Sequence, residues 1–201
     1  VDSPMYKQEV LNQYVTLTAG SVYWSFDRKI HVKPTKLDKY AHVNIGVDFN
    51  IDNMSGIYCQ QEGDTLRVCQ EVHLTQQNAN TFSLAKQMSK DLFDYPHRSI
   101  FPDSTGKARK TSSQKSDHQI LKDAGFILNS TTNPPIRDRQ NSVNRLFTMN
   151  KIEIDPSCSH LIRELETLSS REKEGDVVHM SVALGYIIHK LYPVVRRKKS
   201  Y

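Results

Sequence analysis

The stretch His42-Val43-Asn44-Ile45-Gly46-Val47-Asp48-Phe49-Asn50 decides the fold. Its β-branched residues and its length are typical of a central strand, and Asp48 stands where that strand ends. A turn is expected at 50–53. Two further strand-like runs follow at 55–60 and 66–74, joined by the hairpin signal Glu62-Gly63-Asp64. The main domain therefore opens with a three-strand antiparallel meander.

Helices and strands alternate over the rest of the chain. Helices are expected at 81–93, 118–124, 136–147, 155–168 and 176–191, and short strands at 99–101, 126–128 and 151–154. A meander followed by this alternation implies an α/β fold, in which helices flank both faces of a mixed sheet. We expect a lead-in over 1–40 that packs on the domain, the domain itself over 41–192, and a basic, loose tail over 193–201.

Composition limits the class of protein. The 201 residues, 37% of them hydrophobic, are enough for one substantial core. The mean hydropathy is −0.58, and no apolar run approaches the roughly 18 residues of a membrane span. The three cysteines form no Cys-x-x-Cys pair, which suits a reducing compartment and gives no zinc pattern. The net charge of +5 permits an anionic partner without demonstrating one.

Two common catalytic motifs are absent. The stretch Asp103-Ser104-Thr105-Gly106-Lys107 evokes a phosphate-binding loop, but Phe101 stands where that loop needs its first glycine, and Ala108 follows the lysine. We therefore expect no bound nucleotide. The sequence also has no Gly-x-Ser-x-Gly elbow for a serine nucleophile.

Three aspartates are candidates for a metal site. Asp48 ends the first central strand, Asp103 follows a later strand, and Asp176 begins the expected last helix. Each has an ordinary structural explanation, as a strand end, a turn residue and a helix cap respectively. Together they would need a cation such as Mg²⁺ or Mn²⁺, because three converging carboxylates repel one another. Asp52 is a further possible ligand or a turn residue.

Other polar side chains extend this candidate site. His179 lies three residues after Asp176, so a helix would place both on one face. It would then touch a metal, a phosphate or water, or it would be an ordinary half-buried histidine. Basic residues that could neutralise DNA phosphates are Lys107, Arg109, Lys110, Lys115, Arg137, Arg139 and Arg145. A solvated surface is the alternative explanation for these charges. No aromatic residues alternate with them, so DNA binding would be largely independent of sequence.

Four segments together resemble the C-terminal nuclease domain of the large terminase subunit of tailed double-stranded DNA bacteriophages, of the headful-packaging, short-tailed kind. These segments are Asn44–Asn50, Phe101–Gly106, Ile152–Pro156 with Leu161–Leu165, and Gly175–Tyr186. The resemblance covers most of the chain. It implies an RNase H-like fold and an endonuclease that cuts concatemeric viral DNA with two Mg²⁺ or Mn²⁺ ions.

The resemblance also assigns individual residues. It matches Asp48 and Asp103 to two of the family's acids and selects Asp176 as the third. Glu174 is the reserve, because the position of a further family aspartate is Val182 here. The lead-in would then be the connector from an N-terminal ATPase motor, for which this chain carries no motif.

Partners follow from the same resemblance. They are double-stranded DNA, the portal ring, the small terminase subunit and the procapsid, all in the host bacterial cytoplasm. The terminal basic cluster would dock on the portal or contact DNA; it comprises Arg196, Arg197, Lys198 and Lys199. Two alternatives stay open. One is a non-catalytic module that docks on DNA or the portal, and the other is an RNase H-like enzyme of the resolvase or integrase type.

Overall fold

The computed structural model describes residues 20–50, 52–108, 115–129, 132–170 and 179–193. Its centre is a six-stranded sheet in the order β5-β4-β1-β2-β3-β6. The strands are β1 (Val43–Asp48), β2 (Asn53–Glu62), β3 (Thr65–Thr75), β4 (Arg98–Pro102), β5 (Ile127–Leu128) and β6 (Ile152–Ile154). The helices are α2 (Arg28–His31), α3 (Thr81–Asp91), α4 (Asp117–Asp123), α5 (Ile136–Thr148), α6 (Ser159–Thr167) and α7 (Met180–Leu191), with 3₁₀ turns η2 (Gln76–Asn78) and η3 (Ser104–Lys107).

The expected antiparallel meander forms the middle of the sheet. β1 pairs with β2, and β2 pairs with β3, both antiparallel. Gly63 turns the β2–β3 hairpin at φ +60°, a conformation that residues with a Cβ rarely adopt. The pairing sets Asp48 opposite Ser55, and Ser55 opposite His73.

Parallel strands complete the sheet on both sides. β4 pairs with β1 and β5 pairs with β4, while β6 joins the opposite edge beside β3. The sheet is thus mixed, as the order of elements predicted. β1 and β4 run in the same direction, so their carboxyl ends meet at one edge.

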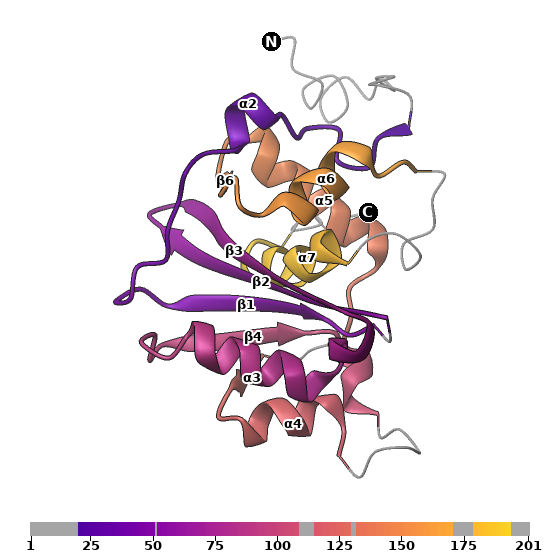
Figure 1. Ribbon diagram of the computed structural model, residues 1–201. Helices are drawn as coiled ribbons and strands as arrows, with labels where there is room; N and C mark the ends of the chain where they lie inside the picture. Colours follow the sequence, from indigo (N-terminus) through magenta and orange to yellow (C-terminus); the bar gives the residue numbers. More distant parts are fainter. Residues whose placement is uncertain (1–19, 51, 109–114, 130–131, 171–178, 194–201) are drawn as a thin grey trace, which may run out of the picture.

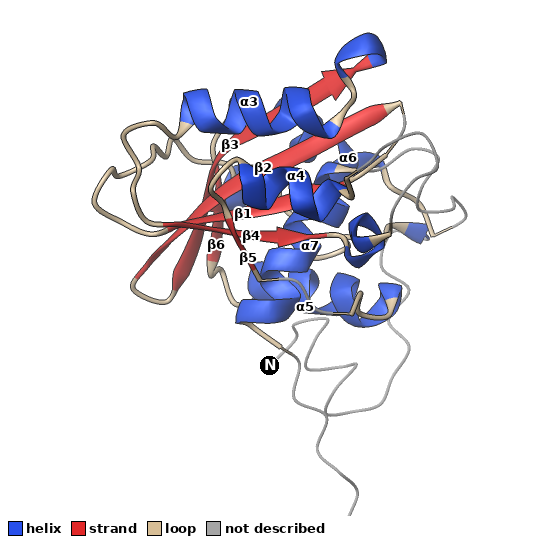
Figure 2. Cartoon of the chain, turned by 90° about the horizontal axis from the view of Figure 1, so that it is seen from below, coloured by secondary structure: helices blue, strands red, loops and turns tan. Residues whose placement is uncertain are grey.

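Helices cover both faces of the sheet, as expected (Figures 1 and 2). α3 and α4 pack on one face, and their core includes Val43, Ile45 and Val47 of β1. α5, α6 and α7 pack on the other, over a core that includes Ile57 and Cys59 of β2. Because side chains alternate along a strand, Asp48 faces the side of α7.

Several expected element boundaries were wrong. α3 ends at Asp91, and Phe93, expected on its apolar face, is 85% exposed. The helix expected from 155 begins at Ser159, and the last helix begins at Met180 rather than at 176. The apolar period alone does not fix where a helix begins or ends.

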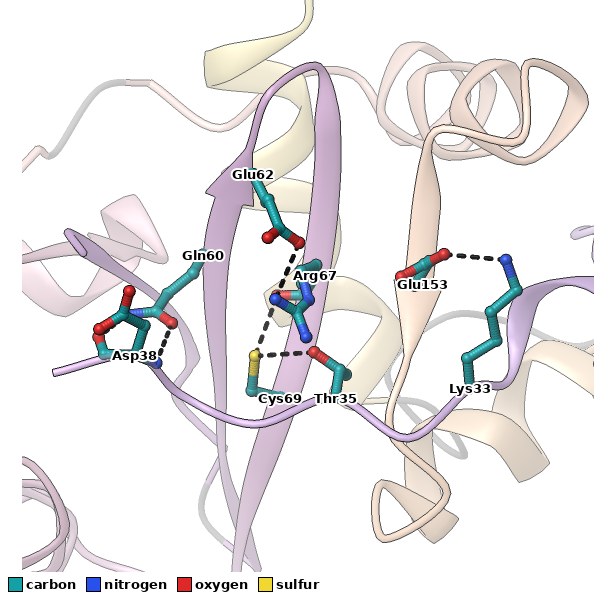
Figure 3. A network of polar contacts seen from close by, with 8 residues as sticks. All are labelled: Lys33, Thr35, Asp38, Gln60, Glu62, Arg67, Cys69 and Glu153. Atoms are coloured by element: carbon teal, nitrogen blue, oxygen red, sulfur yellow. Dashed lines mark hydrogen bonds and ion pairs between the residues drawn. The ribbon is translucent and has the colours of Figure 1, made fainter. Parts of the chain in front are cut away.

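The described part of the lead-in packs on the domain. Lys33 pairs with Glu153 of β6 at 2.8 Å, and the Thr35 amide donates to Asp155 at 2.8 Å. The Asp38 amide donates to the Gln60 side chain of β2 at 2.7 Å. Figure 3 shows this loop crossing from Lys33 beside Glu153, past Thr35 and Cys69, to Asp38 beside Gln60. Among the described residues, no helix is long and apolar enough to cross a membrane.

Candidate active site

Two of the predicted acids meet where β1 and β4 end. Asp48 is the last residue of β1, and Asp103 directly follows Pro102, the last residue of β4. The Asp103 amide donates to the carbonyl of Val47 at 3.0 Å, which extends the parallel pairing to the carboxylates themselves. Asp48 is 8% exposed and Asp103 is 9% exposed. Ligands of α/β proteins usually bind at this edge of the sheet.

Neighbours orient the Asp103 side chain. Its Oδ1 accepts hydrogen bonds from the Thr105 amide at 2.8 Å and from Asn133 Nδ2 at 2.7 Å. The Asn133 Oδ1 in turn accepts from the Ser104 amide at 2.8 Å, and His118 Nε2 donates to the Asp103 carbonyl at 2.7 Å. The sequence singled out neither Asn133 nor His118 for the site. In the sequence, only the pair Pro134-Pro135 after Asn133 marks a break in the chain before α5.

His179 contacts Asp48 directly. Its Nδ1 lies 3.1 Å from Asp48 Oδ2, and both side chains are about 10% exposed. Burial raises the pKa of Asp48, and the charge of Asp103 raises it further, against the hydrogen bond from His179. That hydrogen bond raises the pKa of His179. The Asp48–His179 pair therefore holds a proton readily, and a cation bound by Asp48 would compete with that proton.

Two glycines let α7 approach closely enough to make this contact. A Cβ at Gly46 of β1 would lie 2.1 Å from the Ala183 carbonyl oxygen of α7. A Cβ at Gly185 would lie 2.4 Å from Cγ of Arg139 on α5. With no side chain at either position, α7 lies directly against β1 and α5. His179, immediately before α7, is thereby brought to the end of β1.

Glu164 holds the first turn of α7. Its carboxylate accepts hydrogen bonds from the amides of His179, Met180 and Ser181 at 2.9, 3.0 and 2.7 Å. These amides have no partner inside their own helix, and the helix dipole favours a negative charge beside them. Glu71 of β3 accepts in the same way from the first amides of α6. Sequence reasoning missed Glu164, because capping by a residue of another helix leaves no local signal.

The remaining acidic predictions are placed as follows. Asp52 is exposed in the turn before β2. Asp176 and Glu174 lie outside the described residues. His179 is the N-cap residue of α7 and does not lie inside the helix. The prediction that His179 lies on a face of this helix was therefore wrong. Within the described ranges, no three His, Cys, Asp or Glu side chains come close enough to hold a metal ion. Asp48 and Asp103 nevertheless offer the oxygen donors that Mg²⁺ and Mn²⁺ prefer.

The basic candidates do not form one surface. Lys107 and Arg137 are exposed, and Lys115 pairs with Asp123 at 2.6 Å. Arg139 is 4% exposed, with its guanidinium 5.0 Å from the ring centre of Tyr186, so it lies in the interior rather than on a surface that DNA phosphates could reach. Arg145 is partly buried. The other basic candidates lie outside the described residues; they are Arg109, Lys110, Arg196, Arg197, Lys198 and Lys199.

Comparison with solved structures identifies the fold. No protein-family model matches the sequence, and no curated protein matches it. The large terminase of a thermophilic bacteriophage matches with a TM-score of 0.75 and 16% identity, over 95% of this chain and 50% of that one. This chain therefore spans half the length of that protein.

Two separate nuclease domains match over nearly their whole length. For the P22 large terminase nuclease domain, the TM-score is 0.63 at 12% identity, over 87% of this chain and 94% of that one. For the bacteriophage SPP1 large terminase nuclease domain with bound Mn, the TM-score is 0.55 at 14% identity, over 80% of this chain and 95% of that one. The chain has the RNase H-like fold of phage large terminase nuclease domains.

Proposed function

We propose that this chain is a metal-dependent endodeoxyribonuclease and the nuclease part of a phage DNA-packaging terminase. The observation that carries the proposal is the meeting of Asp48 and Asp103, two buried carboxylates, where the parallel strands β1 and β4 end. The resemblance of four sequence segments to terminase nuclease domains supports the same function, and so does the fold that the chain shares with such domains. The nuclease domain with the same fold from SPP1 was solved with Mn bound.

The side chains suit hydrolysis of a phosphodiester. Asp48 and Asp103 would hold divalent cations, with Asp176 as the proposed third ligand and Glu174 as its reserve. Two such ions would activate water and stabilise the leaving oxygen. The hydrogen bonds from Thr105 and Asn133 fix the Asp103 carboxylate before the ions bind. His179 orients Asp48 and lies near enough to position the attacking water.

The biological substrate and partners follow from the proposed family. The substrate would be concatemeric viral double-stranded DNA, cut during packaging in the host cytoplasm with little sequence preference. The portal ring, the small terminase subunit and the procapsid would be the partners. The lead-in would connect to an ATPase motor, and the basic tail 196–199 would contact the portal or DNA.

Plasmid cleavage with Mn²⁺ tests the proposal. Wild-type protein should nick and linearise supercoiled plasmid, and chelation of the metal should stop it. Asp48→Asn and Asp103→Asn should each lower the rate by at least about 100-fold, because each removes a charged ligand from the metal site. Asp64→Asn is the matched control: this exposed acid lies in the β2–β3 hairpin and pairs with Lys151. The control should keep wild-type activity.

The result separates the candidate functions. Cleavage that persists unchanged in Asp48→Asn and Asp103→Asn would contradict the carboxylate mechanism. A wild-type protein that binds duplex DNA but never cuts it with Mg²⁺ or Mn²⁺ would instead support a non-catalytic docking module. Cutting restricted to branched junctions or particular end sequences would favour a resolvase or integrase type. The 201 residues are expected to cut slowly on their own, because they carry no ATPase motif of a motor that would position DNA.

A further inference from the structure

A hollow lies next to Asp103, on the side of α4. It has a volume of about 410 Å³ and lies between η3, α4 and the end of β5. The residues that line it are Lys107, Ser116, His118, Gln119, Lys122 and Leu128. Apart from Lys107 and His118, none of them belongs to the proposed active site or to the basic residues singled out in the sequence.

Two lysines line this hollow, and no acidic side chain among the described residues lines it. In the described part of the chain, no acidic side chain pairs with Lys107 or Lys122. The two acids of α4 are engaged elsewhere: Asp123 by Lys115 and Gln119, and Asp117 by Thr81 Oγ1. Lys107 and Lys122 both line the hollow, so their ammonium groups act on the same small space.

His118 links the hollow to the active site. It lines the hollow, and its Nε2 donates to the Asp103 carbonyl at 2.7 Å. Its ring packs beside Phe49, the residue after Asp48, at 5.9 Å between centroids. His118 thus contacts both the hollow and the backbone of Asp103. A DNA strand presents a phosphate about every 3.4 Å along the helix axis, so a strand at Asp103 carries further phosphates over this surface.

From this arrangement we infer that the hollow between η3 and α4 binds a backbone phosphate of DNA, with Lys107 and Lys122 as its cations and Gln119 and Ser116 as polar neighbours. The inference rests on the proposed function, because the DNA would be the strand that reaches Asp48 and Asp103. Contacts to phosphate set the position of a strand without reading its sequence. The hollow would thereby hold the strand in place beside the carboxylates.

Duplex binding measured without divalent metal tests this inference. Fluorescence anisotropy with a labelled duplex of about 20 base pairs in EDTA gives the dissociation constant at several salt concentrations. Removing one phosphate contact should make the slope of log K against log salt shallower by about 0.9. Between about 50 and 200 mM salt, wild type should therefore lose about 3.5-fold more affinity than Lys122→Ala. The Lys107→Ala Lys122→Ala double variant should show about twice the change in slope.

Two controls make the measurement specific. Lys90→Ala removes an equally exposed lysine from the last turn of α3, at the edge of the sheet where β4 begins. Its salt slope should equal that of wild type. Lys122→Arg keeps the charge and should also retain the wild-type slope. Alanine is the best helix former, so Lys122→Ala should leave α4 intact, as circular dichroism would show.

The outcomes separate this inference from the proposed nuclease function. Binding curves and slopes of Lys107→Ala and Lys122→Ala that overlay wild type would overturn the phosphate site, whatever the cleavage results. Slopes that change as expected, in a protein whose plasmid cleavage does not depend on Asp48, would support the phosphate site and reject the nuclease mechanism. If inorganic phosphate shifts the NMR signals of the hollow but duplex DNA does not, the site binds free phosphate and the inference is also overturned.

Discussion

Replacing Gly46 with alanine should damage the site through the backbone of α7. The added Cβ would lie 2.1 Å from the Ala183 carbonyl oxygen and 2.7 Å from its carbon. Ordinary contact begins at 3.4 Å, so the helix would have to retreat by about 1.3 Å. Neither Ala183 atom can rotate away, because both belong to the backbone of a buried helix. Overpacking typically costs about 1–3 kcal/mol, and we expect about 3 kcal/mol here.

Chemical denaturation measures this cost. Urea unfolding can be followed through Trp24, the single tryptophan. A loss of about 3 kcal/mol should lower Tm by roughly 6–12 °C in a protein of this size. Mn²⁺-dependent cleavage should fall as well, because a retreat of α7 carries His179 away from Asp48.

Gly56→Ala is the matched control for this prediction. Gly56 lies on β2 opposite Val47, and a Cβ there would meet nothing closer than 3.6 Å. Its stability should stay within about 1 kcal/mol of wild type, since alanine loses less backbone entropy than glycine on folding. Equal urea midpoints for the Gly46 and Gly56 variants would refute the close approach of α7 to β1.

Two further predictions concern the surroundings of the carboxylates. Glu164→Gln should destabilise the protein by about 1–2 kcal/mol through the loss of a charged cap. It should also lower Mn²⁺-dependent cleavage more than Asn80→Ala, which removes the α3 cap on the other face; equal effects on cleavage would show that Glu164 only supports stability. His118 has a lowered pKa in the folded protein, so its contribution to stability is complete above its unfolded pKa of about 6.5 and is lost as pH falls below it. Urea titrations from about pH 7.5 to 5 should therefore show a smaller loss of unfolding free energy in His118→Gln than in wild type. Equal losses in the two proteins would contradict this role of His118.

Local patterns of the sequence predicted most of the sheet and two of the acids. The β-branched run 43–47 predicted β1, and the following aspartate was expected at its end, where Asp48 stands. In the same way, the short strand expected at 99–101 predicted that Asp103 would lie just after a strand end. Such patterns succeed because residue spacing decides which face of an element is buried and where it stops.

Tertiary packing decided the rest, because it joins residues that are far apart in the chain. Glu164 reaches the first amides of α7, and Asn133 reaches back to Asp103. The absence of a side chain at Gly185 lets Arg139 of α5 lie buried against α7. The sequence by itself thus determined the strands, most helices and the positions of Asp48 and Asp103. Only the packing of α7 against β1 and α6 decided that His179 would lie beside Asp48, because close contact of backbones depends on both partners and not on a local pattern.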